Sequence, residues 1–204
     1  MLSVPTSLGF ERIAHLIPTL LDRNPRLRVD LRFEDRAVDL LEDGVDIAIR
    51  AGRLPPDSPF VVARQLASFA RVVCASPKLL ARCGRIDAVA KLSKLPCVVH
   101  GAPPTVWEFQ TPEGPESVVV DGRFRTNNLL AVRDAAAAAI GIAWLPSWLA
   151  EAGLRARRLK IVLPAAKLSP VVVYGLFHAQ ARSAIAVRSV LDYFSTELRA
   201  SLGK

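Results

Sequence analysis

Residues 27–53 read LRVDLRFEDRAVDLLEDGVDIAIRAGR, and this stretch decides the fold class. From Leu27 to Phe33 apolar residues alternate with charged ones, a period of two that predicts a strand with one buried face. Ala37 to Asp43 has apolar residues at helical spacing, and Gly44 follows where a left-handed residue ends a helix. Val45 to Ala51 is almost continuously apolar, which predicts a strand covered on both faces.

Strands and helices alternate over the rest of the chain, which predicts an α/β fold. Because two strands joined by a helix are most easily parallel, the quoted stretch predicts a right-handed crossover unit. Residues 8–23 form an amphipathic helical pattern that Pro18 should bend or interrupt. Residues 60–66 and 69–75 are predicted as two strands.

The bulk composition describes a globular chain without a membrane span. Apolar residues make up 51% of the 204 residues, but no apolar run approaches the roughly 20 residues that cross a bilayer. No basic start and no sustained apolar block opens the sequence, so we expect no signal peptide and a cytoplasmic location. Of the three cysteines, Cys74 and Cys97 lie in apolar strands, where cysteine mostly acts as a small buried hydrophobe.

The net charge of +8 raises the question of a nucleic-acid partner. The basic residues are scattered, apart from Arg155, Arg157, Arg158 and Lys160, and aromatic residues do not interleave with them. An arginine-rich surface is the favoured explanation, and a modest attraction to anionic ligands or to nearby DNA phosphates is the alternative.

Catalytic and metal motifs are not found. His15, His100 and His178 lack metal-ligand spacing, and the nucleophile elbow, the P-loop and the dinucleotide glycine fingerprint do not occur. We therefore expect no enzyme, no metal and no cofactor, although a Ser-His-Asp triad is assembled in space and stays open at this point.

Several short motifs occur in a recognisable order. They are residues 36–55 (RAVDLLEDGVDIAIRAGRLP), Pro5-Thr6-Ser7-Leu8-Gly9, residues 71–80 (RVVCASPKLL), Trp107-x-Phe109, Asn127, Gly141-Ile142-Ala143-x-Leu145-Pro146, Val171 to Tyr174, and Val187-Arg188 with Asp192. In this order they resemble the effector-binding domain of the LysR-type transcriptional regulators. The resemblance covers essentially the whole chain.

The resemblance implies two Rossmann-like lobes joined by a two-crossing hinge, like the type II periplasmic-binding-protein fold. Residues 1–74 and 171–204 would form lobe one, and residues 75–170 would form lobe two. A small, anionic effector would bind in the cleft between them. The family regulates transcription as dimers and tetramers and binds DNA through an N-terminal winged helix-turn-helix.

The sequence departs from the family pattern in three places. The winged helix-turn-helix is absent, so we expect a piece of a longer regulator that contacts DNA only through the missing part. Ala139 stands where glycine is usual before Ile140-Gly141, a change that a helix should tolerate. Ala184-Ile185 replaces the usual Ser-Pro ahead of the last helix.

Candidate effector contacts in lobe one follow the ends of strands, where ligands of α/β sheets bind. Ser7, with Thr6, would start the first helix, where free N–H groups and the helix dipole favour an anion; capping alone is the alternative. Arg50 ends a strand and could pair with a carboxylate effector. An internal ion pair of Arg50 with Asp35 or Asp46 is the favoured alternative.

The remaining candidates lie in lobe two and in the returning strand. Asn127 would mirror Ser7 at the start of the alanine-rich helix 129–139, which either Asn127 or Asn128 caps. The other candidates are Ser76, His100, Gly101 and Phe177, and a plain structural role is the alternative for each. Ser76 should cap the helix at the hinge, and His100 and Gly101 lie at a strand end. For Phe177 a core position is favoured.

The family's dimers imply a self-contact and leave rival functions to compare. Helix 8–23, with Leu20, would lie against the partner's helix beginning near Leu129. One rival is a free-standing solute-binding protein of the same fold, against which the missing signal peptide argues. The others are an α/β enzyme and a domain whose cleft is filled by its own side chains.

Overall fold

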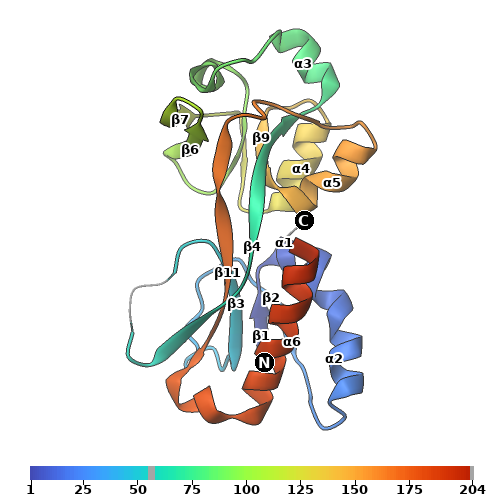
Figure 1. The fold of residues 1–204 in the computed structure, drawn as a ribbon, viewed down its shortest axis with the longest axis vertical. Coiled ribbons are helices and arrows are strands. Elements are labelled where there is room, and N and C mark those ends of the chain that lie inside the picture. Colours follow the sequence, from blue (N-terminus) through green and yellow to red (C-terminus); the bar gives the residue numbers. More distant parts are fainter. Residues whose placement is uncertain (55–57, 203–204) are drawn as a thin grey trace. The chain divides into compact units, whose positions relative to one another are not determined.

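The computed structural model describes residues 1–54 and 58–202, except the side chains of residues 182 and 183. The chain forms two compact units (Figure 1). Unit 1 is Met1–Phe69 together with the segment from Val171 onward, and unit 2 is Ala70–Pro170. The chain passes from one unit to the other twice, within strand β4 (Val61–Ala75) and within strand β11 (Lys167–His178).

Unit 1 has a sheet in which β1 lies between two parallel neighbours. Its elements besides parts of β4 and β11 are β1 (Leu2–Val4), α1 (Thr6–Leu8), the π-helical segment η1 (Gly9–Ile13), the 3₁₀ segment η2 (Ala14–Leu16), α2 (Ile17–Arg23), β2 (Leu31–Phe33), β3 (Ile47–Ala51), the 3₁₀ segment η4 (Ala179–Ser183) and α6 (Ile185–Leu202). The strand order is β4-β11-β3-β1-β2, with β11 antiparallel to β3.

The predicted parallel strands are confirmed, but the helical connection lies elsewhere in the chain. β2 and β3 both run parallel to β1, and helices α1 to α2 connect β1 to β2. The strand predicted from Leu27 begins only at Leu31, because its partner β1 is three residues long and its register pairs Leu2 with Leu31.

The helix predicted over residues 37–43 is wrong, because the chain makes a single turn before β3. The Asp39 carboxylate accepts hydrogen bonds from the backbone N–H groups of Leu41 and Glu42, at 2.9 and 3.0 Å. Such a side chain offers the backbone a local alternative to helical bonding. Gly44 closes the turn with φ +64°, the left-handed conformation that its position predicted.

The first helical region is interrupted at Pro18, as predicted. Proline has no N–H to donate to the carbonyl of Ala14, and the Ile17 N–H bonds to that carbonyl instead, which makes a 3₁₀ turn. Leu20 is 0% exposed, so the expectation that it lies on a partner-facing surface is wrong. Phe10, which is 68% exposed, is the large apolar side chain that this region presents outward.

The two strands predicted at residues 60–66 and 69–75 are one strand, β4, of 15 residues. The residues between the two predicted strands are Ala67 and Ser68. Neither is a glycine or a proline, so neither interrupts the extended conformation. The strand is therefore long enough to carry the chain from one unit into the other.

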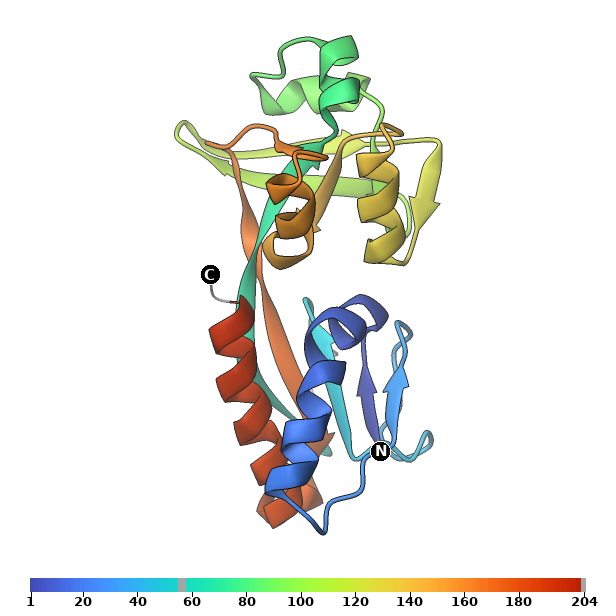
Figure 2. The ribbon, with the colours of Figure 1, turned by 90° about the vertical axis from the view of Figure 1, so that its right-hand side faces the viewer.

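Helix α6 covers unit 1 with the apolar face that its sequence predicted, and it lies beside α2 (Figure 2). Its buried face includes Val190, Leu191, Phe194 and Leu198. A polar contact ties α6 to the 3₁₀ segment η2 that precedes α2, since the Tyr193 hydroxyl donates to the Leu16 carbonyl at 3.0 Å. None of the helices among residues 1–54 and 58–202 is long and apolar enough to cross a membrane.

Unit 2 combines a hairpin, short strands and three helices. Besides parts of β4 and β11, its elements are α3 (Pro77–Cys83), the 3₁₀ segment η3 (Val89–Lys94), β5 (Val98–His100), β6 (Thr105–Thr111), β7 (Gly114–Val120), β8 (Phe124–Thr126), α4 (Leu129–Ala137), β9 (Ala143–Pro146), α5 (Ser147–Arg155) and β10 (Lys160–Ile161). β9 and β10 pair with β4, β6 pairs with β11 and β7, and β5 pairs with β8.

The end of α4 corrects one sequence prediction. The helix stops at Ala137, and Ala139 lies beyond it with φ +65°. A residue with a Cβ atom pays about 1–2 kcal/mol in this left-handed conformation. The expectation that a helix tolerates Ala139 is therefore wrong: this position belongs to a helix stop, where glycine has the advantage.

The three cysteines differ in burial, which predicts a selective thiol reactivity. All are free; Cys74 and Cys97 are buried, as predicted, and burial raises the pKa of each to about 12, whereas Cys83 is partly exposed. At pH 8 we expect iodoacetamide to label only Cys83 in the folded chain and all three thiols in urea, measured by mass spectrometry.

A Cys83→Ser variant is the control and should stay unlabelled until it unfolds; labelling of two sites in the native protein would contradict the burial.

The raised pKa values of Cys74 and Cys97 also determine how stability depends on pH. Because thiols in the unfolded chain ionise near about pH 8.5, Cys74 and Cys97 leave stability unchanged below that pH. Stability should fall as the pH rises from there towards 12.

Candidate functional site

The carboxyl end of the unit 1 sheet holds a charged network around Ser3. The Ser3 hydroxyl is fully buried, donates to Glu34 Oε2 at 2.9 Å and accepts from Arg50 Nη2 at 2.8 Å. Arg50 Nη1 donates to the carbonyls of Ser3 and Ile49, at 3.2 and 2.7 Å. Burial lowers the pKa of the Arg50 guanidinium, and the charge of Glu34 acts in the opposite direction.

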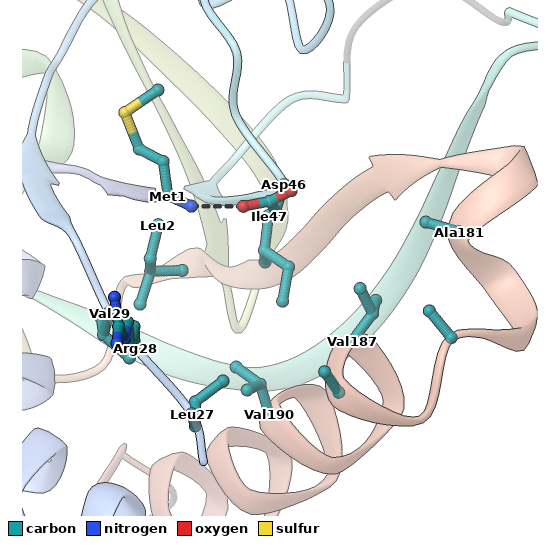
Figure 3. Close-up of a pocket in the computed structure, with 12 residues that line it drawn as sticks. Met1, Leu2, Leu27, Arg28, Val29, Asp46, Ile47, Ala181, Val187 and Val190 are labelled. Atoms are coloured by element: carbon teal, nitrogen blue, oxygen red, sulfur yellow. Dashed lines mark hydrogen bonds and ion pairs between the residues drawn. The ribbon is translucent and has the colours of Figure 1, made fainter.

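The favoured alternative for Arg50, a direct ion pair with Asp35 or Asp46, is not what the described residues form. Arg50 reaches Glu34 through Ser3, and Asp46 pairs with the Met1 amino group (Figure 3). The internal network nevertheless engages both terminal nitrogens of Arg50. An effector carboxylate at Arg50 would therefore share the guanidinium with Ser3.

The first helix starts differently from the prediction. Its N-cap residue is Pro5, and Ser7 lies inside α1 with 5% exposure, so the capping role predicted for Ser7 is wrong. The Thr6 N–H, one of the free donors of the helix start, donates to Asp35 Oδ1 at 3.0 Å. An internal carboxylate thus occupies a position where an anionic ligand was expected.

An apolar groove of about 350 Å³ lies elsewhere in unit 1 (Figure 3). Val187 and Val190 project from α6 towards it, and Leu2, Leu27 and Ile47 line its other side. None of the predicted effector residues is among its described lining residues. The groove and the charged network are therefore separate features of the same unit.

In unit 2 the structure brings three predicted residues together where β5 and β8 end. His100 pairs with Thr126 in the parallel register, and its Nε2 lies 3.1 Å from the carbonyl oxygen of Asn127. Gly101 has φ +88° and open space where a side chain would be, and its N–H donates to the Thr126 carbonyl. Asn128, not Asn127, caps α4, by accepting from the N–H of Leu130 at 2.8 Å.

Because Asn128 performs the capping, the carboxamide of Asn127 stays exposed and has no partner among the described residues. It can donate and accept hydrogen bonds with a ligand. Ser76 and Phe177 have less capacity to contact a ligand, because both side chains are buried. The buried Ser76 hydroxyl caps α3 as predicted, at 3.2 Å from the Leu79 nitrogen, and Phe177 is 5% exposed and lies opposite Ile47 in the sheet.

The sequence prediction missed Arg71, which lies at the edge of this cluster. Its guanidinium carbon is 5.2 Å from the centre of the Trp144 ring, and the His100 ring meets the same indole edge-on at 5.7 Å. Arg71 Nε donates to the Ser169 carbonyl at 2.8 Å. The signal in the sequence was a charged residue inside an otherwise apolar strand, but its neighbours lie about 70 and 100 residues away.

Metal binding has no support among the described residues, since they hold no group of three His, Cys, Asp or Glu side chains that could bind an ion.

Comparison with known proteins gives a direct family assignment. The family model of the LysR substrate binding domain matches residues 1–199. The chain belongs to this family.

Relatives and solved structures agree with a LysR substrate-binding domain. The HTH-type transcriptional regulator DmlR of Escherichia coli K12 is 31% identical over 198 residues, which is 95% of this chain and 64% of DmlR. The regulatory domain of CrgA, a LysR-type regulator of Neisseria meningitidis, superposes with a TM-score of 0.83 at 22% identity, over 97% of both chains. The full-length virulence activator AphB of Vibrio cholerae gives a TM-score of 0.80 at 22% identity, over 96% of this chain and 66% of AphB.

These comparisons confirm the predicted family and the two-lobed, periplasmic-binding-protein-like fold class. This LysR-family chain spans only 53% to 66% of the length of the curated relatives it matches. Relatives such as DmlR, AaeR and TtdR are named as transcriptional regulators and activators. Activities of a whole regulator are therefore properties of longer proteins than the chain described here.

Proposed function

We propose that this chain is the effector-binding and oligomerisation domain of a LysR-type transcription regulator, and that it binds a small anionic molecule to control transcription. The observation that carries the proposal is the family match over residues 1–199, which covers nearly the whole chain. We propose a binding domain without catalytic activity, because the relatives are named as transcriptional regulators and activators.

In this proposal units 1 and 2 are the two lobes, and β4 and β11 are the hinge strands between them. A ligand that binds one hinge angle more tightly than another shifts the population towards that angle. The effector contacts we propose are Thr6, Ser7, Arg50, Ser76, His100, Gly101, Asn127 and Phe177. Of these, Asn127 and Gly101 have the best support, from an unpartnered carboxamide and from open space.

Self-association and DNA binding complete the proposal. The exposed Phe10 on the helical region of residues 6–23 supports a dimer contact there, because a large apolar side chain at a surface favours a protein partner. DNA would be bound by a helix-turn-helix segment outside this chain, as the name of DmlR indicates for that relative. A regulator that acts on bacterial DNA would work in the cytoplasm.

A thermal-shift screen tests the effector proposal. At a ligand concentration 100 times the dissociation constant, binding to the folded state adds about 2.7 kcal/mol. For a chain of this size we expect the unfolding midpoint to rise by about 5–10 °C with a cognate small molecule. The screen should include carboxylates, sugars, amines and uncharged aromatics, so that it does not presuppose one class.

Two controls separate the rival functions. Each stabilising compound is incubated with the protein and recovered by liquid chromatography, and it should come back unchanged; turnover would instead identify an enzyme. A screen in which no class of compound shifts the midpoint would contradict effector binding and favour a domain whose cleft is filled by its own side chains.

A further inference from the structure

Arg71 is a partly buried arginine whose charge is supported by an aromatic ring and a carbonyl. Its side chain is partly buried, Nε donates to the Ser169 carbonyl at 2.8 Å, and the guanidinium lies on the Trp144 ring. Its two terminal nitrogens, Nη1 and Nη2, have no hydrogen-bond or ion-pair partner among the described residues. In contrast, the terminal nitrogens of Arg50 are engaged by Ser3.

A partly buried cation without an anion is energetically unfavourable. Burial lowers the pKa of Arg71, and the charge of Glu108 acts in the opposite direction without a direct contact. Buried charges in proteins are normally paired and hydrogen-bonded, because desolvation removes the stabilisation that water supplied. The local charge adds to this need: unit 2 holds 14 Lys and Arg against 7 Asp and Glu, which is nearly the whole net charge of the chain.

The geometry of Arg71 suits an anion that presents two oxygens side by side. The Nε bond to Ser169 and the contact with the Trp144 ring fix the plane of the guanidinium, which leaves its Nη1–Nη2 edge as the donor pair. Two parallel N–H donors in a fixed plane match the two oxygens of a carboxylate, and a guanidinium held in place loses little entropy on binding.

The neighbours of Arg71 within unit 2 extend this edge into a site. Antiparallel pairing of β4 with β9 places Val73 opposite Trp144. Arg71 lies two residues before Val73 on β4, and its side chain contacts the indole of Trp144. The His100 ring meets the indole at 77°, and Asn127 contacts His100 through its carbonyl. Trp144 therefore connects the cation to the exposed carboxamide of Asn127 through groups of one compact unit.

We propose that the Nη1–Nη2 edge of Arg71 binds the carboxylate of the effector, which makes Arg71 a specificity-determining residue of this chain. The inference rests on the proposed effector-binding function and narrows the ligand to a small carboxylic acid. Uncharged analogues of the same shape lose the paired hydrogen bonds and bind more weakly. Trp144, which lies against the cation, reports the binding event through its fluorescence.

The test measures binding of benzoate and succinate, with benzamide as the uncharged match to benzoate. Titration calorimetry and tryptophan fluorescence are recorded for the native chain and for Arg71→Gln. We expect at least one of the two carboxylates to bind, benzamide to bind at least about 10-fold more weakly than benzoate if benzoate binds, and Arg71→Gln to weaken carboxylate binding by about 10- to 100-fold. In a Trp144→Phe variant the fluorescence change should disappear.

Arg64→Gln is the matched control. Arg64 lies on the same strand but is paired with Asp192 at 2.6 Å in unit 1, so its removal should leave carboxylate affinity unchanged. If Arg71→Gln does not fold, as judged by circular dichroism, Arg71→Lys keeps the charge and the stem but loses the paired donors, and it should still weaken binding several-fold.

Three results would overturn the inference. They are equal affinity of the native and Arg71 variants for a carboxylate, equal affinity for benzoate and benzamide, and failure of both carboxylates to bind the native chain. The last result would leave effector binding itself open to support from the sugars, amines and uncharged aromatics of the thermal-shift screen, which would then replace the anionic ligand of the proposed function. Failure of the inference and failure of the effector-binding function are therefore distinguishable.

Discussion

Replacing Gly122 with alanine is expected to destabilise the chain by about 3 kcal/mol or more, enough to leave much of it unfolded at 37 °C. The reason is a contact with backbone. A Cβ atom at Gly122 would lie 1.7 Å from the Cys97 carbonyl oxygen, and one at Gly141 would lie 2.6 Å from the Cys97 carbonyl carbon. The two glycines therefore enclose one peptide group, which packing on both sides prevents from moving aside.

Urea denaturation followed by circular dichroism measures this effect, with Gly84→Ala as the control. Gly84, unlike Gly122, has a positive φ of +69°, but a side chain there would meet nothing within 4 Å. Its replacement should cost only the conformational strain of a backbone region that glycine alone adopts easily, about 1–3 kcal/mol. If Gly122→Ala and Gly84→Ala are equally stable, the close approach to Cys97 is not a constraint on the fold.

Local sequence pattern predicted those elements whose cause is local. The apolar run of β3, the Ser76-Pro77 helix start and the apolar face of α6 are all found where the sequence pattern indicated. The helix predicted at residues 37–43 failed because Asp39 binds the backbone with its own side chain, a competition that apolar spacing does not register. The prediction for residues 60–75 was wrong in a different way, because it divided one strand into two. No strand-breaking residue separates the two apolar patterns.

The candidate site was less predictable than the fold, because a site depends on what surrounds each side chain. Helix starts suggested Ser7 and Asn127, but Ser7 is buried inside its helix, and the neighbouring Asn128 performs the capping. Arg50 and Arg71 look alike in sequence because, apart from Asp46, each is the one charged residue of a strand predicted at residues 45–51 or 69–75. Only the structure shows that Ser3 satisfies the first, whereas Trp144 supports the second without neutralising it.

A second large effect separates folding from self-association on the first helical region. Leu20→Asp removes a fully buried apolar side chain and places a charge in the core, which together should cost more than about 4 kcal/mol and unfold unit 1. Phe10 is 68% exposed, so Phe10→Asp should leave the fold intact. If residues 6–23 form the dimer contact, the Phe10 variant should sediment as a monomer at concentrations where the native chain is dimeric.

Phe60→Asp is the matched control, because Phe60 is similarly exposed in unit 1 but lies outside the helical region. Analytical ultracentrifugation should show that this variant dimerises like the native chain, and circular dichroism should show that both phenylalanine variants are folded. A native chain that is monomeric at every concentration would exclude the contact altogether. A two-fold contact would bury the charge introduced by Phe10→Asp twice in each dimer, without a partner, which is costly. A folded Phe10→Asp variant that still dimerises would therefore show that the interface lies on another surface.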